Sequence, residues 1–247
     1  MFPTSGFVRF NIRKLVQEEE QADKTIGFRD IGNLRFYSQY AGVKREYQAH
    51  GLGILIKEFQ REIVRDVLGI RTVICTYDPL TGVNAYRNIH HFGMEVLQYR
   101  VATYGEYGGL LNRSDVATDR FLMAWDLSRP PRGDSAGAEL PAAGIAHVLR
   151  VDVRRVRGKT SVLDLEVVRD ADLGVGGDAV LVQIPRDFYE MLQETDVEDA
   201  DVRRIPVDWR LHTRRAFQSL FERGYRVIDF LKSEPARPGN FYIIKRP

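Results

Sequence analysis

The sequence predicts an α/β protein of the α+β type, with a mixed sheet and flanking helices. Three observations lead to this prediction. Short segments that alternate between apolar and polar residues, as strands do, occur in both halves of the chain. Between them, apolar residues recur at helical spacing. Two of the helical segments are followed by a glycine and then directly by another strand.

The N-terminal part predicts two strands before the first helix. Residues 6–12 alternate between apolar and polar side chains, and residues 34–43 form a second strand candidate that is rich in aromatics. The charged stretch at 17–23 lies between them and is most simply a solvated loop.

From Leu52 the apolar period becomes that of a helix, and Gly69 supplies its end. The residues that carry this period are Leu52, Leu55, Ile56, Phe59, Ile63 and Val67.

A strand, a short helix and two more strands complete the N-terminal part. Residues 71–77 predict a buried strand, in which Cys75 is a small core residue. The helix covers 84–92, and the strands follow at 94–99 and 121–125.

The C-terminal part begins with a predicted hairpin. Strands at 148–156 and 161–168 flank an Arg-Gly-Lys turn at 157–159. The remaining elements are a buried strand at 179–184, a helix whose face carries Trp209, Thr213, Phe217, Leu220 and Phe221, and strands at 225–231 and 241–245.

A compositional break separates the two parts. Residues 129–144 are rich in Pro, Gly, Ala and Ser and lack periodicity, which is typical of a linker. We therefore expect one domain over 1–128 and a second α/β region over 145–247.

The segments 91–99 and 222–230 echo each other. Each contains a helix end, a stop glycine (Gly93 or Gly224) and an alternating strand. Two explanations stay open: a degenerate duplication of a helix–strand–strand unit, or the general habit of glycine to end helices before strands.

Composition excludes several classes of protein. The 247 residues hold 36 Lys and Arg against 34 Asp and Glu, a net charge of +2 that is too balanced to predict binding to nucleic acid or to a membrane surface. One cysteine excludes an internal disulfide framework and a multi-cysteine zinc site, and the His90-His91 pair lacks a fitting third ligand, so we predict no metal site. No apolar run approaches the roughly 18 residues of a membrane span, and no signal segment begins the chain, so we expect a cytoplasmic protein.

The sharpest motif is Gln48-Ala49-His50-Gly51-Leu52-Gly53, which lies between a predicted strand and a long helix. This position presents backbone N–H groups at a helix N-terminus, where an anion is attracted. The glycines let a phosphate approach the main chain, because no Cβ stands in the way. A tight turn explains a Gly-x-Gly equally well in isolation, and the strand before it and the helix after it favour the phosphate site.

The motif Gln48-x-x-Gly51-x-Gly53 resembles the pyrophosphate loop of the GNAT superfamily of acyl-CoA-dependent N-acetyltransferases. Together with the rest of the chain, from about residue 38 to residue 245, it resembles a prokaryotic branch with an extra C-terminal region. Further segments that carry this resemblance are 38–43, 46–47, 76–80, 84–85, 104–105, 119–121, 184–185, 209–210, Arg214, 224–225 and 229–230.

The resemblance implies a GNAT-like fold, an acetyl-CoA site and the transfer of an acetyl group to an amine. The strand ending at Val43 would face the pantetheine arm and polarise the thioester carbonyl through a backbone N–H. The 48–53 loop would hold the pyrophosphate, and Asn84 would reach the cofactor through its amide. The cofactor-binding residues implied are Ala41, Val43, Gln48, Ala49, His50, Gly51, Leu52, Gly53 and Asn84.

The sequence departs from the family pattern at the acid that protonates the leaving thiolate. Many members carry a tyrosine four residues before the glycine that ends this helix, and here Ile89 stands there. Tyr86, His91 and Tyr104 are the catalytic candidates, with His90 a further substitute. A surface histidine or a tyrosine packed on the core is the plainer explanation for each.

The N-terminal part is also shorter than the resemblance implies. About 40–60 further residues, forming a strand, two helices and a second strand, would be expected before the loop. Two explanations stay open: a start codon assigned too late, or loss of the helices that wall the acceptor pocket.

Two charged clusters predict exposed surfaces. Asp164, Glu166 and Asp170 are expected to form a solvated face. The hairpin is also expected to carry a basic ridge, an exposed strand edge, for which contact with the nucleotide phosphate of CoA or with an acidic partner is the alternative. Its residues are Arg150, Arg154, Arg155, Arg157 and Lys159.

Three functions remain in competition. The first is an acetyl-CoA-dependent N-acyltransferase that acts on a small or amino-acid-like amine, with a homodimer as one compatible assembly. The second is a non-catalytic acyl-CoA-binding or regulatory protein, which Ile89 and the short N-terminal part favour. The third is a structural dimerisation module in which Gly51 and Gly53 form a plain turn.

Overall fold

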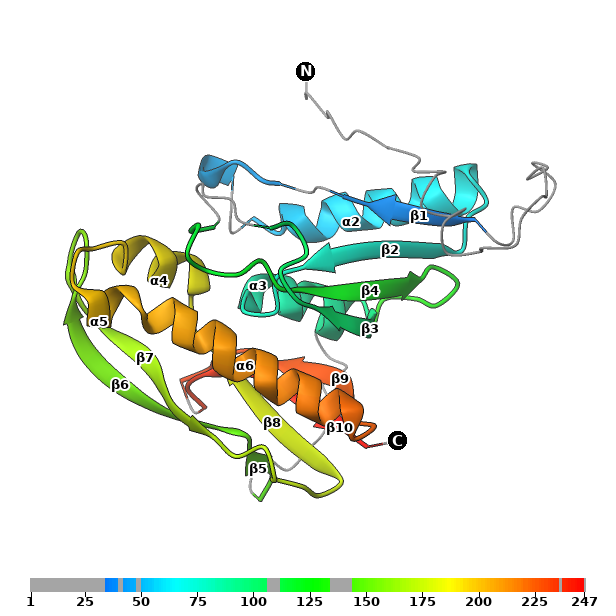
Figure 1. Ribbon diagram of the computed structural model, residues 1–247. Helices are drawn as coiled ribbons and strands as arrows, with labels where there is room; N and C mark the ends of the chain where they lie inside the picture. The colour runs from blue at the N-terminus through cyan, green and yellow to red at the C-terminus, as the bar shows by residue number, and fades with distance from the viewer. Residues whose placement is uncertain are drawn as a thin grey trace. The chain divides into compact units, whose positions relative to one another are not determined.

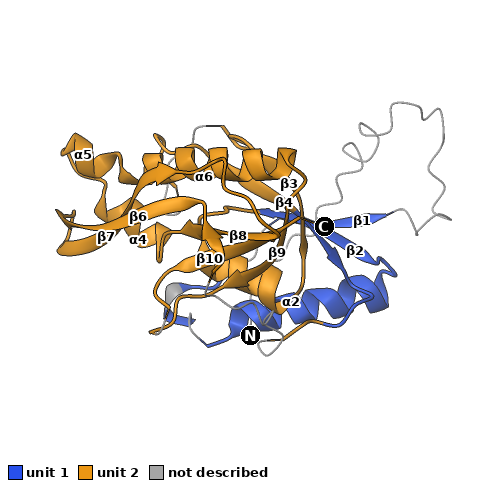
Figure 2. Ribbon diagram, turned by 90° about the horizontal axis from the view of Figure 1, so that it is seen from below, with its two compact units in different colours: residues 1–76, 123–130 blue, residues 77–122, 131–247 orange. Residues whose placement is uncertain are grey.

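Alternating helices and strands build the chain, as Figure 1 shows. The computed structural model describes residues 34–39, 42–47, 50–105, 112–133, 144–235 and 237–246. These residues form two units, one of residues 1–76 and 123–130 and the other of residues 77–122 and 131–247 (Figure 2). The boundary between the units does not coincide with the linker at 129–144, so the domain division drawn from composition stays a prediction.

The described elements confirm the mixed α/β class. In chain order they are β1 (Arg35–Ser38), the 3₁₀ turn η2 (Arg45–Tyr47), α2 (Leu52–Glu62), the π-helical turn η3 (Ile63–Val67), β2 (Thr72–Tyr77), α3 (Gly82–Ala85), the π-helical turn η4 (Tyr86–His91), β3 (Glu95–Arg100), β4 (Arg120–Asp126), β5 (Ala146–His147), β6 (Leu149–Arg157), β7 (Val162–Ala171), β8 (Ala179–Ile184), α4 (Phe188–Glu194), α5 (Ala200–Arg203), α6 (Ile205–Glu222), β9 (Arg226–Leu231) and β10 (Asn240–Lys245).

In the first unit, α2 connects two parallel strands. β1 pairs with β2 in parallel, with Phe36 opposite Val73. The helix runs on into the π-helical turn η3 and ends before Gly69, whose φ of 68° lies in the left-handed region. The predicted helix and its stop glycine are therefore confirmed, as is the buried position of Cys75 in β2.

The apolar residues that predict α2 lie on its outer side. Phe59 is 61% exposed and Val67 is 71% exposed, whereas Lys57 is buried. The Lys57 ammonium donates to Ser38 Oγ over 3.3 Å and lies 5.9 Å from the centre of the Trp125 ring. These partners satisfy a cation on the inner side of the helix, so burial here does not follow the apolar period.

Two sheets of four strands share one strand order. The first is β1-β2-β4-β3 and the second is β5-β8-β10-β9. In each sheet, the first two strands along the chain are parallel neighbours. The fourth strand along the chain lies between the second and the third. In the second sheet the ribbon of β6 and β7 connects the parallel strands, where the first sheet has α2.

The two similar segments, 91–99 and 222–230, lie at equivalent positions in the two sheets. Gly93 with φ 63° follows η4 and leads into β3, and Gly224 with φ 85° follows α6 and leads into β9. The shared strand order therefore favours duplication over a coincidence of stop glycines.

The hairpin and the C-terminal elements form where the sequence predicts them. β6 pairs with β7 as an antiparallel ribbon, and α6 packs on β7. Trp209 and Phe217 of α6 are fully buried. The Trp209 indole donates to the Glu166 carbonyl oxygen over 2.8 Å, which ties the helix to the ribbon.

One member of the predicted acidic face is buried. Asp164 and Asp170 are exposed as expected, but the prediction is wrong for Glu166. Its carboxylate accepts from the backbone N–H of Arg186 over 2.7 Å, so a main-chain donor beside β8 replaces the solvent.

The second predicted strand is shorter than the sequence indicates. It was expected over 34–43, but β1 ends at Ser38, and Val43 lies outside any strand. The predicted strand at 6–12 and the loop at 17–23 lie outside the described residues, as do residues 134–143 of the linker. Among the described helices, none has the length and apolar character to cross a membrane.

Candidate functional site

The predicted anion site starts at a left-handed glycine. Gly51 is the N-cap of α2, with φ 72° and ψ 0°, and its carbonyl accepts from the N–H groups of Ile54 over 2.9 Å and Leu55 over 3.2 Å. No side chain caps this helix, and the N–H groups of Leu52 and Gly53 find no backbone acceptor among the described residues. A Cβ added at Gly51 would meet nothing within 4 Å. The turn is therefore open to a ligand, with two N–H donors at the positive end of the helix dipole.

The rest of the loop is described in part. His50 is exposed at a bend directly before Gly51, and Val43 is partly buried between β1 and η2. Ala41, Gln48 and Ala49 lie outside the described residues.

Asn84 lies in α3, in the second unit, and its amide already has two partners. Its Nδ2 donates to Thr81 Oγ1 over 3.1 Å, and its Oδ1 accepts from the Arg87 guanidinium over 2.5 Å. Thr81 Oγ1 in turn donates to the Asp78 carbonyl over 2.7 Å. These bonds fix the orientation of the amide, which keeps one N–H available to a ligand.

Two of the three catalytic candidates lie on η4. The Tyr86 ring stacks on His90 at 4.8 Å, and Lys232 Nζ lies 5.7 Å from the centre of the same ring. The His91 ring packs edge-on against Phe92 at 4.7 Å.

Tyr104, the third candidate, belongs to a different neighbourhood. Its ring lies 5.3 Å from the guanidinium carbon of Arg120, and its backbone N–H donates to Thr118 Oγ1 over 3.1 Å. Its side chain is half-exposed.

A buried histidine–carboxylate pair accompanies Tyr86. His90 Nδ1 lies 2.9 Å from Asp229 Oδ1, and both side chains are buried. The same carboxylate oxygen accepts from the Phe230 N–H over 2.8 Å. The pair fixes the imidazole ring and joins η4 to β9, so His90 is the oriented histidine of this helix.

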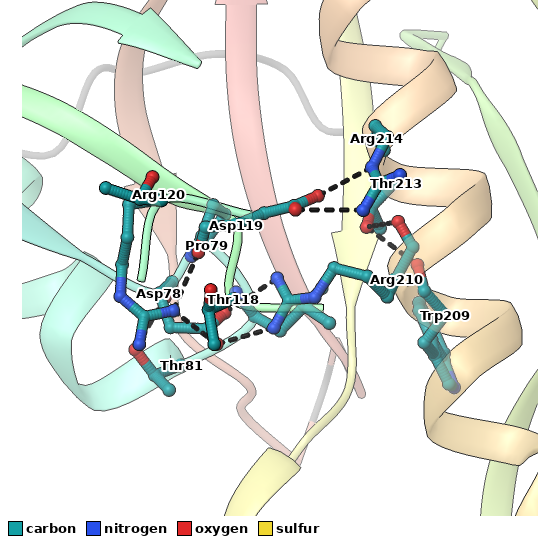
Figure 3. Close-up of polar contacts among 12 residues, drawn as sticks. Asp78, Pro79, Thr81, Thr118, Asp119, Arg120, Trp209, Arg210, Thr213 and Arg214 are labelled. Atoms are coloured by element: carbon teal, nitrogen blue, oxygen red, sulfur yellow. Dashed lines mark hydrogen bonds and ion pairs between the residues drawn. The ribbon is translucent and has the colours of Figure 1, made fainter. Parts of the chain in front are cut away.

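A larger charged network that the sequence does not predict lies at the start of α3 and β4 (Figure 3). Arg210 of α6 is 1% exposed and donates to the two oxygens of Asp78 over 2.9 and 2.5 Å. Arg120 approaches the same carboxylate at 3.3 Å and also donates to the Asp119 carbonyl over 2.8 Å. Asp78 Oδ1 accepts from the Leu80 N–H as well, which shapes the turn after β2.

Asp119 forms the second half of this network. It is 0% exposed, and Arg214 donates to both of its oxygens over 2.8 and 2.9 Å. The Tyr99 hydroxyl donates to it over 2.7 Å, and the Ala102 N–H over 2.9 Å. All of its bonding capacity is therefore used inside the protein.

Burial and charge act against each other in this network. Burial opposes the charge on Arg210, but attraction and hydrogen bonding by Asp78 outweigh it and hold the pKa of the guanidinium above its ordinary value. The hydrogen bonds to Asp119 likewise raise the pKa of Arg214. Burial, together with the charge of Asp119, raises the pKa of Tyr99 well above 10.0, so its hydroxyl stays a donor.

Comparison with protein-family models, curated proteins and solved structures finds no match for this chain. The resemblance to GNAT enzymes therefore rests on the chain's own motifs. Among the described residues, no group of three or more His, Cys, Asp or Glu side chains could hold a metal ion.

Sequence reasoning missed the network although its residues lay in the motifs. Asp78, Asp119, Arg210 and Arg214 all belong to segments that carry the resemblance. Arg210 directly follows the core residue Trp209, and a charged residue beside the apolar face of a predicted helix was the signal available.

Proposed function

We propose that this chain binds acetyl-CoA and transfers the acetyl group to the amine of a small or amino-acid-like acceptor, as a GNAT-type N-acyltransferase. One observation carries the proposal. A left-handed glycine and an uncapped helix N-terminus stand between two parallel strands, β1 and β2, with open space where a side chain would be.

This arrangement suits a pyrophosphate. Two backbone N–H groups and the helix dipole supply positive potential without a basic side chain, in keeping with the near-zero net charge of the protein. The order of elements also supports the proposal. Strand, helix, strand, helix, strand and strand, which the apolar and polar spacing of residues 34–125 predicts, is the order of β1, α2, β2, α3 with η4, β3 and β4.

The reaction proposed is a direct attack. The neutral amine nitrogen bonds to the thioester carbonyl carbon, the carbon–sulfur bond breaks, and the CoA thiolate leaves and takes up a proton. A base or a chain of waters accepts the proton that the amine loses. Tyr86, His91 and Tyr104 are the candidates for these transfers, and the fixed ring of His90 adds a fourth.

Calorimetry with acetyl-CoA tests the binding step. The wild-type chain should bind, and Gly53→Glu should abolish binding because it brings a carboxylate and a side chain to the phosphate position. This variant should not harm the fold, because glutamate favours helix over glycine by about 0.5–1 kcal/mol and is favoured near a helix N-terminus.

A matched control separates the local effect from the added charge. Val67→Glu places the same side chain at the exposed C-terminal end of η3 and should leave the affinity unchanged. No binding by the wild type, or equal binding by Gly53→Glu, would refute the proposed site.

The second candidate is a non-catalytic acyl-CoA-binding protein. The observation that favours it is Ile89, a buried aliphatic residue at the position where the resemblance expects the proton-donating tyrosine. Single-turnover transfer to a panel of amines distinguishes the two functions, since binding without transfer would leave only this candidate.

A further inference from the structure

The helix α2 turns polar side chains to the sheet and apolar ones outward. In the first unit it lies along β1 and β2 (Figure 1). Gln60 Nε2 donates to Ser38 Oγ of β1 over 3.0 Å, and the buried Lys57 ammonium donates to the same oxygen. Arg61 donates to two backbone carbonyl oxygens that follow β4, each over 3.3 Å. A surface helix usually packs its apolar side on the protein, so the outer side of α2 is the unusual one.

Five large apolar side chains form a stripe along this outer side. Leu55, Ile56, Phe59, Ile63 and Val67 are between 37% and 71% exposed. Residues three and four apart share one side of a helix, and the wider π-helical turn η3 keeps the last of them on that side. The stripe is the densest group of exposed large hydrophobic residues in the described part of the chain. A contiguous patch of this kind marks an interaction surface.

Two carboxylates border the stripe. Glu58 and Glu62 are four residues apart, so their side chains are neighbours on the helix surface. Neither forms an ion pair with another described residue, whereas Asp66 in the same row is bound by Arg65 at 2.6 Å. Two like charges at this spacing destabilise a helix, and a cation beside them relieves the repulsion. The occupant that fits this surface is therefore both apolar and basic.

One segment of the chain combines these two properties. Residues 7–16, Phe-Val-Arg-Phe-Asn-Ile-Arg-Lys-Leu-Val, contain six apolar side chains, three basic ones and no acid. They lie outside the described residues. We propose that this segment binds to the outer side of α2, with its apolar side chains on the stripe and its basic side chains beside Glu58 and Glu62.

The connection between the segment and β1 is long enough for this contact. Residues 17–33 join the segment to residue 34, directly before β1. Since Ser38 of β1 is bonded to α2, the connection ends beside the helix. A chain of this length spans up to about 60 Å when fully extended, whereas the stripe is about 18 Å long. A tethered segment meets its site at an effective concentration of about 1 mM, so a modest intrinsic affinity suffices.

The same charges argue against two other occupants. Glu58 and Glu62 would repel a membrane surface that carries anionic lipids. A second copy that packed its α2 against this one would bring a further acidic pair into the interface. Residues 7–16 supply the countercharge that both of these occupants lack. The inference does not depend on the proposed acetyl-CoA site.

A spin label on the segment tests the inference in the full chain. Ser5→Cys provides the attachment point, because Cys75 is buried and stays unlabelled. A nitroxide at this position should broaden the methyl resonances of Leu55 and Val67 in the NMR spectrum. Phe59→Lys should lower the equilibrium constant for docking by about tenfold or more, since it places a charge in the stripe and repels the basic segment.

The control is Val153→Lys, the same kind of change at an exposed position of β6, which should leave the broadening unchanged. Phe59 and Val153 are both more than half exposed, so neither variant should unfold the protein. No broadening along α2 in the spin-labelled chain, or equal broadening in Phe59→Lys, would overturn the inference. So would the same broadening between a spin-labelled chain and a separate isotope-labelled chain, because the occupant would then be a second copy.

Charge reversal tests the recognition itself. Glu58→Lys together with Glu62→Lys should release the segment and remove the broadening. Adding Arg9→Glu, Arg13→Glu and Lys14→Glu should restore it, because the two surfaces are again of opposite charge. A loss that the reversed segment does not restore would contradict the pairing of these charges and overturn the inference.

Discussion

Replacing Arg210 with methionine should lower the free energy of unfolding by about 3 kcal/mol. The substitution keeps most of the aliphatic length of the side chain and removes both hydrogen bonds to Asp78. Loss of one partner from a buried ion pair costs about 3–5 kcal/mol, because the other charge stays behind without compensation. We expect the lower end of this range, since Asp78 keeps Arg120 at 3.3 Å and the Leu80 N–H at 2.9 Å.

Urea unfolding followed by tryptophan fluorescence measures this loss, with Trp209 next to the substituted residue. The control is Arg204→Met, which breaks an exposed pair with Asp208 at 3.0 Å at the start of the same helix and should cost less than about 1 kcal/mol. Adding Asp78→Asn to Arg210→Met should recover part of the lost stability, because it removes the stranded carboxylate charge but also takes the carboxylate partner from Arg120. A loss below about 1 kcal/mol in the single variant, or no recovery in the double variant, would refute the network as a source of stability.

Three further substitutions test other parts of the structure. Hydrogen bonds from Thr160 hold the pKa of the Glu194 carboxyl below its ordinary 4.5, so its stabilisation is complete above pH 4.5 and is lost as the pH falls through the lower folded-state value. Glu194→Gln should therefore destabilise the protein near neutral pH and bring it closer to the wild type on acidification, as urea midpoints at several pH values would reveal. Tyr242→Phe removes the hydroxyl that donates to the Pro79 carbonyl over 2.7 Å, and we expect a loss of about 1–2 kcal/mol in the same unfolding assay. Gly224→Ala should cost about 1–2 kcal/mol through its φ of 85° alone, because a Cβ there meets nothing within 4 Å; an unchanged melting temperature would count against this explanation.

The strands and stop glycines were predictable because their signals are local. Residues 179–184 are a continuous apolar run, and β8 occupies those positions with four of its six residues buried. Gly93 and Gly224 end helices because only glycine enters the left-handed region at little cost, which a sequence shows without a partner.

The direction in which α2 faces was not predictable in the same way. The apolar period fixes which residues share a side of the helix, but not which side meets the sheet. Lys57 is buried because Ser38 and the Trp125 ring accept its ammonium, and these partners lie 19 and 68 positions away in the sequence.

In the candidate site, too, the local features could be predicted from the sequence and the long-range contacts could not. The turn at Gly51 could be predicted because a helix N-terminus and its glycines are adjacent in the chain. The network could not, since Arg210 and Asp78 are 132 positions apart and Arg214 and Asp119 are 95 apart. Their segments were recognisable as motifs, but the residues that neutralise each charge appear only when the two sheets and α6 are folded.

The same long-range pairs explain why the second unit contains residues from both strand-order repeats. Asp78 and Asp119 come from the first repeat, and the arginines that neutralise them come from α6 of the second. Without α6, Asp119 would lose its countercharge Arg214 and keep two hydrogen-bond donors, and the Phe121 ring would lose its contact with Phe217. Residues 77–122 should therefore fold only together with residues 131–247. We therefore expect that the two four-stranded sheets do not fold as independent domains, since arginines of α6 neutralise the carboxylates of Asp78 and Asp119.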